Sequence, residues 1–154
     1  MRTILLSVRP EVFENIRSAK KIYEHRKVFP DEPITAFLYV GRPQQEIAGL
    51  MILKNRHSLS EWKEKFAHDT EALNRIDEYM NHYRYVMEIH EFQEIKHISL
   101  EIIKKQFPDF LIPQMYYYLD NTELLTFLTA NIKPISKKIQ NDFSKIDSTQ
   151  ICVF

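Results

Sequence analysis

Lys21, Glu24 and Arg26 are the residues of this 154-residue chain whose types and spacing best suit chemistry. They fall in the segment Lys21-Ile-Tyr-Glu-His-Arg-Lys27, which is typical of a β-strand. Side chains two residues apart share a strand face, so Glu24 and Arg26 are expected to lie together. A partly buried lysine beside a carboxylate could act as a base or pair with phosphate. The planar fork of an arginine could hold a phosphate or the edge of a base.

The same residues admit a structural interpretation. Glu24 and Arg26 could be an ion pair that braces the strand, with Lys21 solvated at a turn, because ion-pair networks also perturb charged groups. Ser7, on the preceding strand, could donate to a ligand in the same cleft or bond only to backbone. The spacing alone leaves both interpretations open.

Tyrosines on later strands are candidates for base stacking. Tyr39, Tyr116 and Tyr118 alternate outward on expected strands, and aromatic faces beside a basic cleft stack single-stranded bases. Packing in the core or across strands is the alternative, and it is the commoner use of strand aromatics.

The elements that must position these residues follow from hydrophobic periodicity. Short apolar or alternating runs predict strands at 4–8, 22–28, 34–40, 47–53, 85–92 and 111–119. Apolar residues at helical spacing predict helices at 11–19, 59–81, 99–106, 122–130 and 136–146. A break is expected in the second helix at His68-Asp69-Thr70, and capping boxes at Ser58 with Glu61 and at Asp120 with Glu123.

The order of these elements predicts an α+β fold. The strands mostly meander rather than alternate with helices, which favours a curled mixed sheet or small β-barrel of about five to six strands flanked by helices. Residues 1–154 are expected to form a single domain, with 121–154 as a helical C-terminal extension.

Composition excludes several classes of site. Only Gly41 and Gly49 are present, whereas a Walker A loop or a dinucleotide-binding turn needs several close approaches of backbone to phosphate. The six histidines show no metal-ligand spacing, so the sequence predicts neither a metal centre nor a cofactor. The lone cysteine, Cys152, excludes an internal disulfide and is expected to be buried and inert. No apolar run reaches the roughly 18–20 residues of a membrane span, so we expect a cytoplasmic protein without a membrane partner.

Charge is balanced over the whole chain but not locally. Lys plus Arg and Asp plus Glu each total 21, so net charge gives no sign of nucleic acid binding. Residues 1–27 carry seven Lys or Arg against three acids, a balance of +4. This modest basic patch could attract phosphate on an otherwise neutral protein.

The first 27 residues also carry a family resemblance. The run Leu5-Leu-Ser-Val-Arg-Pro10, then a helix, then the Lys21–Lys27 segment resembles the start of an ASCH domain. That family belongs to the PUA-like superfamily, together with the EVE and YTH domains. Its later strands are matched by 36–40, 47–53, 85–89 and 113–116, so the resemblance covers roughly residues 3–120.

The resemblance implies a small β-barrel whose cleft binds RNA or a nucleotide. Combined with the patterns above, it gives the expected ligand-binding residues as Ser7, Arg9, Lys21, Glu24, Arg26, Tyr39, Gln114 and Tyr116. The sequence does not indicate an oligomeric state.

Two further functions remain open. One branch of the resembled family hydrolyses N4-acetylcytidine with a Lys, a Thr and a Glu. Lys21 matches the Lys, but Glu24 stands where that branch has Thr, and the later Glu could be Glu61, Glu64 or Glu71. In such an amidohydrolase Lys21 and Glu24 would be the catalytic residues.

The other alternative is a regulator that binds duplex DNA. The expected helices at 122–130 and 136–146 could form a helix-turn-helix, as in a subset of the resembled family. The loop of 131–135 is long for that motif, so a helical cap on the barrel is the competing interpretation.

Overall fold

One mixed, seven-stranded sheet organises the chain. The computed structural model describes residues 1–154. Its strands are β1 (Arg2–Val8), β2 (Tyr23–Arg26), β3 (Ile34–Val40), β4 (Glu46–Ser58), β5 (Tyr85–Ser99), β6 (Tyr116–Tyr118) and β7 (Ile139–Gln140). They run in the order β2-β5-β4-β3-β1-β6, with β7 on the edge of β5. The expected α+β fold with a curled mixed sheet is confirmed.

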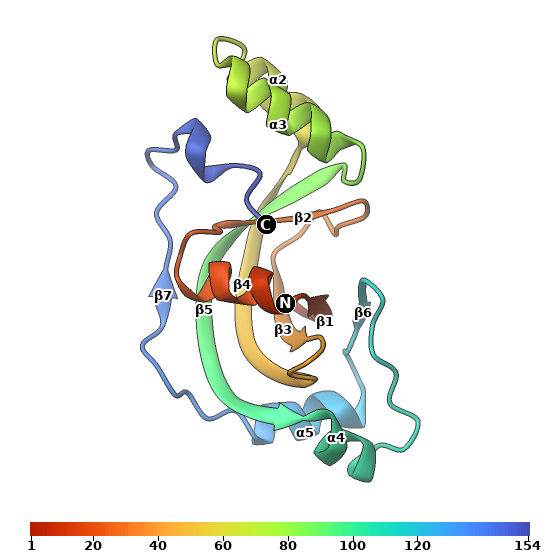
Figure 1. Ribbon diagram of the computed structural model, residues 1–154. Helices are drawn as coiled ribbons and strands as arrows, with labels where there is room; N and C mark the ends of the chain where they lie inside the picture. The colour runs from red at the N-terminus through yellow and green to blue at the C-terminus, as the bar shows by residue number, and fades with distance from the viewer.

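The sheet curls into a half-barrel because β4 and β5 are long and interrupted by bulges (Figure 1). Their pairing shifts register at three places, between Ile47 and Gly49, between Ile52 and Leu53, and between Lys54 and His57. A bulge increases local twist and bends the strand that carries it. Both strands are longer than the sequence predicts, since each continues past its apolar run.

The half-barrel has two ends that no backbone ladder joins. β1 pairs parallel to β3 and antiparallel to β6, while all other pairs are antiparallel. β2 stands at one end of the strand order and β6 at the other. Because β6 pairs only with Ile4–Leu6, the last residues of β1 face β2 across a gap in the sheet.

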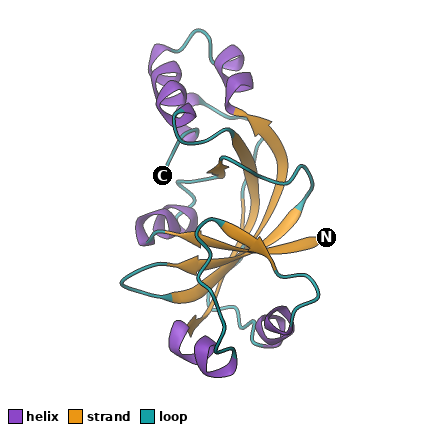
Figure 2. Cartoon of the chain, turned by 90° about the vertical axis from the view of Figure 1, so that its right-hand side faces the viewer, coloured by secondary structure: helices purple, strands orange, loops and turns teal.

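Five α-helices and a short 3-10 helix flank the sheet (Figure 2). They are α1 (Pro10–Arg17), α2 (Leu59–Lys65), α3 (Thr70–Met80), α4 (Leu100–Gln106), α5 (Glu123–Ala130) and η1 (Ser148–Gln150). Pro10 occupies the first helical turn of α1, where its missing N–H needs no partner. The predicted break is confirmed, because Asp69 caps α3 by accepting a hydrogen bond from the Ala72 N–H at 3.0 Å.

Two predicted details of the helices are wrong. Asp120 does not cap α5, because its carboxylate accepts from Arg2 and from the backbone N–H of Thr3, and Thr122 takes the capping position. The helical spacing of Ile76 and Met80 also predicts that both lie on one buried apolar stripe, but Met80 is 41% exposed and the last buried residue of α3 is Tyr79.

The largest correction is at 136–146, which is extended rather than helical. The apolar residues that gave the helical spacing, Ile139, Phe143 and Ile146, instead anchor an extended segment that runs along β5. Pro134 forms a bridge with Ile95, and Ile139 pairs with Phe92. Pairing with the free edge of β5 satisfies backbone groups that a helix would have satisfied internally. The C-terminal extension therefore contains one α-helix, α5.

The core has three parts. One lies inside the half-barrel under α1, another packs the opposite sheet face against α4 and α5, and the third joins α2 and α3 to β2. None of the helices has both the length and the apolar composition needed to cross a membrane.

Gly49 lies on β4 where neighbouring rings leave no room for a side chain, and this gives a stability test. A Cβ there would lie 2.7 Å from Cε1 of Phe92 and 3.2 Å from Cε1 of Phe13, two buried rings packed edge to face. We expect Gly49→Ala to lower the free energy of unfolding by about 1–3 kcal/mol, measured by urea titration. The control is Gly41→Ala, whose Cβ would meet nothing closer than 3.8 Å. Equal effects of the two substitutions would contradict this packing.

Candidate functional site

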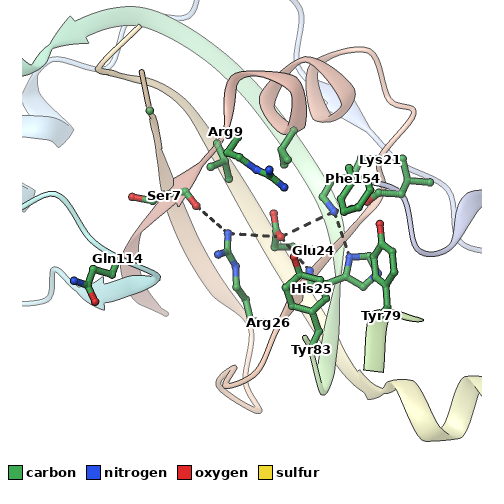
Figure 3. Close-up of a pocket in the computed structure, with 14 residues that line it drawn as sticks. Ser7, Arg9, Lys21, Glu24, His25, Arg26, Tyr79, Tyr83, Gln114 and Phe154 are labelled. Atoms are coloured by element: carbon green, nitrogen blue, oxygen red, sulfur yellow. Dashed lines mark hydrogen bonds and ion pairs between the residues drawn. The ribbon is translucent and has the colours of Figure 1, made fainter. Parts of the chain in front are cut away.

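A cavity of about 300 Å³ lies at the gap between the end of β1 and β2 (Figure 3). β1 and its exit contribute Ser7, Val8 and Arg9, and β2 with its entry contributes Lys21, Glu24, His25 and Arg26. Its remaining lining residues are Val12, Gly41, Tyr79, Tyr83, Gln114, Val153 and Phe154. The charged lining consists of three cationic side chains and one carboxylate, so the cavity is basic.

Lys21 is buried at the floor of this cavity, with 3% of its surface exposed. Its Nζ donates to the Val153 carbonyl at 2.7 Å and to Nδ1 of His25 at 3.3 Å, and lies 4.0 Å from Oε1 of Glu24. Burial lowers the pKa of Lys21, Glu24 opposes that shift, and the positive charge of Arg26 adds to it. The ammonium is thus held by the fold in three directions.

Glu24 uses only one of its two carboxylate oxygens within the protein. Oε1 accepts from the His25 backbone N–H at 3.0 Å and lies 3.6 Å from a terminal nitrogen of Arg26. Oε2 is buried and has no hydrogen-bond partner. An unpaired buried acceptor of this kind costs free energy unless a ligand or water fills the place.

Arg26 joins the two ends of the half-barrel. One terminal nitrogen donates to the Ser7 carbonyl at 2.9 Å, linking β2 to β1 where no backbone ladder does. Its Nε is buried without a partner. The guanidinium therefore closes the sheet with one donor and leaves another unused.

His25 forms the boundary between the charged groups and an aromatic cluster. Its ring lies edge to face with Tyr79, 4.9 Å between centroids, and 6.2 Å from the Trp62 ring. Burial first, and then the charges of Lys21 and Arg26, lower the pKa of His25 well below 6.5. The ring is therefore neutral at pH 7. Since Lys21 can only donate, Nδ1 of His25 accepts and the ring proton is on Nε2.

The C-terminal residues complete the cavity wall. Val153 supplies the carbonyl that holds Lys21, and the Phe154 ring lies 5.5 Å from Tyr79. Cys152 is buried, as predicted, and burial raises the pKa of its thiol to about 12, which disfavours the thiolate.

Six of the eight predicted site residues line this single cavity: Ser7, Arg9, Lys21, Glu24, Arg26 and Gln114. Ser7 bonds to backbone, which is one of the two interpretations that the sequence left open. Its hydroxyl donates to the Pro113 carbonyl, and its own carbonyl receives Arg26. Arg9 is a rim residue, since its side chain is 67% exposed and lies 3.5 Å from Glu11.

The strand tyrosines do not belong to the cavity. Tyr39 is 1% exposed and packs against Phe110 in the core on the other sheet face, so the expectation that it points outward is wrong. Tyr116 is half-buried and stacks on Phe29, with 6.1 Å between ring centroids. Tyr79 and Tyr83, from α3 and the turn after it, provide the aromatic wall instead. The two tyrosines are four residues apart, a spacing that puts both on one side of a helix, but no neighbouring sequence pattern indicates that they lie beside β2.

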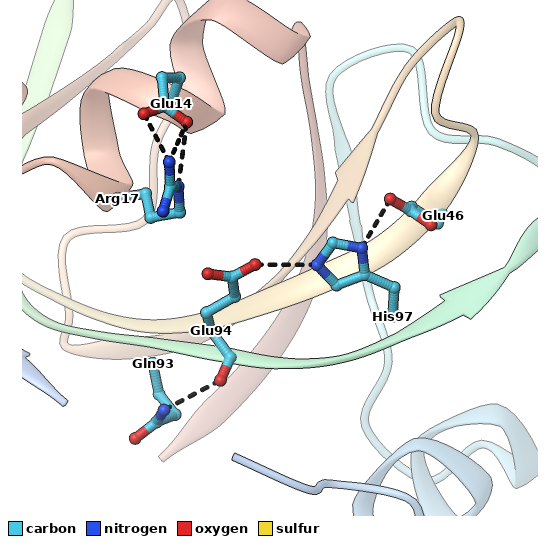
Figure 4. Close-up of polar contacts among 6 residues, drawn as sticks. All are labelled: Glu14, Arg17, Glu46, Gln93, Glu94 and His97. Carbon is cyan, nitrogen blue, oxygen red and sulfur yellow. Dashed lines mark hydrogen bonds and ion pairs between the residues drawn. The ribbon is translucent and has the colours of Figure 1, made fainter. Parts of the chain in front are cut away.

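Three histidines outside the cavity contact carboxylates rather than one another. His97 bridges two glutamates, with Nδ1 2.7 Å from Glu46 and Nε2 2.9 Å from Glu94 (Figure 4). His57 and His90 each lie 2.8 Å from the Glu88 carboxylate. Burial raises the pKa of Glu88, but hydrogen bonds from His57, Asn55 and His90 together bring it below its ordinary value. No group of three or more His, Cys, Asp or Glu side chains is placed to hold a metal ion.

The fold of this chain is similar to solved structures of ASCH proteins. The protein superposes on the crystal structure of an ASCH protein from Zymomonas mobilis with a TM-score of 0.66, 19% identity, and coverage of 86% of this chain and 97% of that one. The chain has an ASCH-like fold. A serine-to-alanine variant of that protein gives a TM-score of 0.64 at 19% identity, covering 84% of this chain and 96% of the other. A tyrosine-to-phenylalanine variant of the same protein gives a TM-score of 0.63 at 18% identity, covering 84% of this chain and 98% of the other.

Sequence comparison adds nothing to this structural likeness. No family model matches the chain, and no curated protein matches it either. The ASCH-like fold agrees with the resemblance seen in the first 27 residues and extends it over most of the chain.

The buried neutral His25 predicts a particular pH dependence of stability. Its pKa is lower in the folded than in the unfolded chain, so below pH 6.5 the unfolded chain binds a proton that the folded chain does not. Stability is therefore lost as the pH falls from 6.5, by at most about 1.4 kcal/mol per pH unit from this group. In urea titrations at several pH values, His25→Gln should remove that part of the slope. If the free energy of unfolding falls equally steeply with pH in both proteins, His25 is not the group responsible.

Proposed function

We propose that this protein binds RNA or a nucleotide in the cavity between β1 and β2. The observation that carries the proposal is the set of buried polar atoms without partners on three successive residues, Glu24 Oε2, His25 Nε2 and Arg26 Nε. Buried polar groups in proteins are nearly always hydrogen-bonded, and exceptions need an explanation. A bound ligand with complementary groups supplies one.

The remaining lining suits a nucleotide. Lys21 and Arg26 make the interior positive, and Arg9 stands at the rim where a phosphate would enter. The rings of Tyr79, Tyr83 and Phe154 form one wall. Aromatic faces stack on bases with little dependence on the nucleotide sequence. The ASCH-like fold supports the proposal further, because the resemblance in the opening residues implies an RNA- or base-binding cleft.

An amidohydrolase acting on an acylated cytidine is the second candidate. One observation favours it, namely that burial lowers the pKa of Lys21 beside the carboxylate of Glu24. The contacts of Lys21 oppose it, because Nζ is already held by the Val153 carbonyl and by His25. Glu24 also provides no hydroxyl nucleophile. The geometry therefore favours binding over hydrolysis.

The helix-turn-helix alternative loses its second helix. Residues 136–146 are extended along β5, so no recognition helix follows α5. We do not propose duplex DNA binding by this segment.

The binding proposal is tested by Arg26→Ala. We expect affinity for a fluorescein-labelled single-stranded RNA to fall by about tenfold or more, because a buried cationic donor is lost. Anisotropy titrations at about 50 mM and about 200 mM salt should also show a smaller salt dependence for the variant.

The matched control is Lys105→Ala, which removes one positive charge from the exposed surface of α4, away from the cavity (Figure 1). Its affinity should equal that of the unaltered protein. If both variants bind equally well, the cavity is not the binding site. Thermal unfolding of each variant checks that the fold is intact.

The second candidate has a direct assay. Incubation of the protein with N4-acetylcytidine, followed by chromatography for cytidine, should give no product above the uncatalysed background. Product formation that Lys21→Met abolishes would establish the amidohydrolase instead.

A further inference from the structure

A band of aromatic rings and guanidinium groups begins at β6, next to the cavity. The guanidinium of Arg2 lies over the Tyr118 ring, with Cζ 3.4 Å from the ring centroid. Tyr118 meets Tyr116 edge to face, and Tyr116 stacks on Phe29, each pair with 6.1 Å between centroids. Gln114, just before β6, lines the cavity, so the band starts beside the proposed nucleotide site.

The band continues across the gap in the sheet to β4 and β5. The segment after β2, which carries Phe29, meets β6 on one side of the molecule (Figure 1). Arg56 donates to the Phe29 carbonyl at 2.8 Å, and its Cζ lies 4.2 Å from the centroid of the Tyr85 ring. Cζ of Arg84 lies 5.1 Å from that centroid, and the Arg84 backbone N–H donates to the Arg26 carbonyl at 3.1 Å. Side chains in contact therefore connect β6 to the start of β5.

This set of side chains is called the arginine–tyrosine band. It consists of Arg2, Arg56, Arg84, Tyr85, Tyr116 and Tyr118. The three tyrosines are half-buried, because their rings pack on the core inside the half-barrel. The arginines lie against two of these rings and reach solvent, since the side chains of Arg2 and Arg56 are 49% and 25% exposed and Arg84 is exposed. The tyrosines thus hold guanidinium groups at the surface.

Positive charge is concentrated at the Tyr85 end of the band. Two guanidinium groups, those of Arg56 and Arg84, lie against the Tyr85 ring. One carboxylate comes within ion-pair distance of them, that of Asp31, 3.4 Å from Arg56. Asp31 is 73% exposed, and an ion pair so open to solvent contributes little to stability. A phosphate group can therefore take the place of this carboxylate.

The β6 end of the band suits bases rather than phosphates. Asp120 lies 3.3 Å from Arg2, and Glu32 lines the same surface hollow, so the positive charge of Arg2 is offset. The planar guanidinium of Arg2 and the half-buried ring of Tyr116 remain as faces for stacking. Unpaired bases stack on aromatic rings and on arginine planes.

We propose that the arginine–tyrosine band binds the nucleotides of single-stranded RNA that flank the one held in the cavity. Arg56 and Arg84 contact phosphates at the Tyr85 end, and bases stack on Arg2 and Tyr116 at the β6 end. This inference rests on the proposed function and names its ligand class, a strand of several nucleotides rather than a free nucleotide. An RNA duplex is not the expected ligand, because its bases are not free to stack.

The first test varies the length of the RNA. Anisotropy titrations at about 50 mM salt compare a fluorescein-labelled dinucleotide with a labelled octanucleotide of mixed sequence. The octanucleotide should bind at least about tenfold more tightly, because it alone reaches both the cavity and the band. Equal affinities would overturn the proposal. So would equally tight binding of the octanucleotide after annealing to its complement.

The second test removes one arginine from each end of the band. In the double variant Arg2→Ala/Arg84→Ala, the ratio of octanucleotide to dinucleotide affinity should fall by about tenfold, roughly threefold for each side chain. The matched control is Lys104→Ala/Lys105→Ala, which removes two exposed positive charges from α4 and should leave the ratio unchanged. Thermal unfolding checks that each variant is folded.

A single substitution covers the case in which the double variant does not fold. The side chain of Arg84 takes part in no hydrogen bond or ion pair, so its removal leaves no partner unsatisfied. Arg84→Ala alone should weaken octanucleotide binding by about threefold. Unchanged octanucleotide affinity in this folded variant would count against the phosphate contact at the Tyr85 end and overturn the band.

The outcomes separate this inference from the function on which it rests. If Arg26→Ala abolishes RNA binding while the double variant binds the octanucleotide normally, the cavity site stands and the band is overturned. Octaglutamate that competes as well as unlabelled octanucleotide also overturns it, because the band would then bind anions without stacking bases. If neither RNA binds, the proposed function itself fails.

Discussion

The hydrogen bond from Arg26 to the Ser7 carbonyl is the contact on which the cavity depends. The sheet leaves its two ends unjoined, and this one guanidinium spans them at 2.9 Å. A charged donor on a buried carbonyl is stronger than an ordinary hydrogen bond, so one side chain can hold the gap. Because a side chain rather than a backbone ladder closes the gap, space remains beside it. The cavity is a consequence of incomplete closure.

The contact between Arg26 and Ser7 also explains why the charged side chains of Glu24 and Lys21 are buried beside it. Arg26 needs a counter-charge in a desolvated setting, and Glu24 provides it at 3.6 Å. Glu24 is in turn approached by Lys21, whose remaining donors reach His25 and the C-terminal segment. Each group is held in place by structural contacts, and Glu24, His25 and Arg26 each keep one buried polar atom without a partner. Preorganisation of this kind lowers the ordering cost of binding a ligand.

Local sequence pattern predicted much of the site and little of its surroundings. The strand at Lys21–Lys27 could be read directly, because its charged residues stand out among apolar neighbours. Tyr39 was misplaced because both faces of β3 are buried, so alternation carries no directional signal there. The extended run at 136–146 imitated a helix because its apolar anchors happen to fall at helical spacing. The contact of Val153 with Lys21 joins residues 132 positions apart, so no local sequence pattern could predict it.

The central claim, that the cavity binds a nucleotide through the unpaired atoms of β2, has a direct spectroscopic test. Arginine Nε–H groups give resolved signals in proton–nitrogen correlation spectra, and Arg17 provides an internal reference because its Nε already donates to Glu14 at 2.9 Å. On titration with a short single-stranded RNA, the account predicts a saturable shift of the Arg26 Nε–H signal, with that of Arg17 unchanged. Binding that leaves the Arg26 signal unmoved would contradict it.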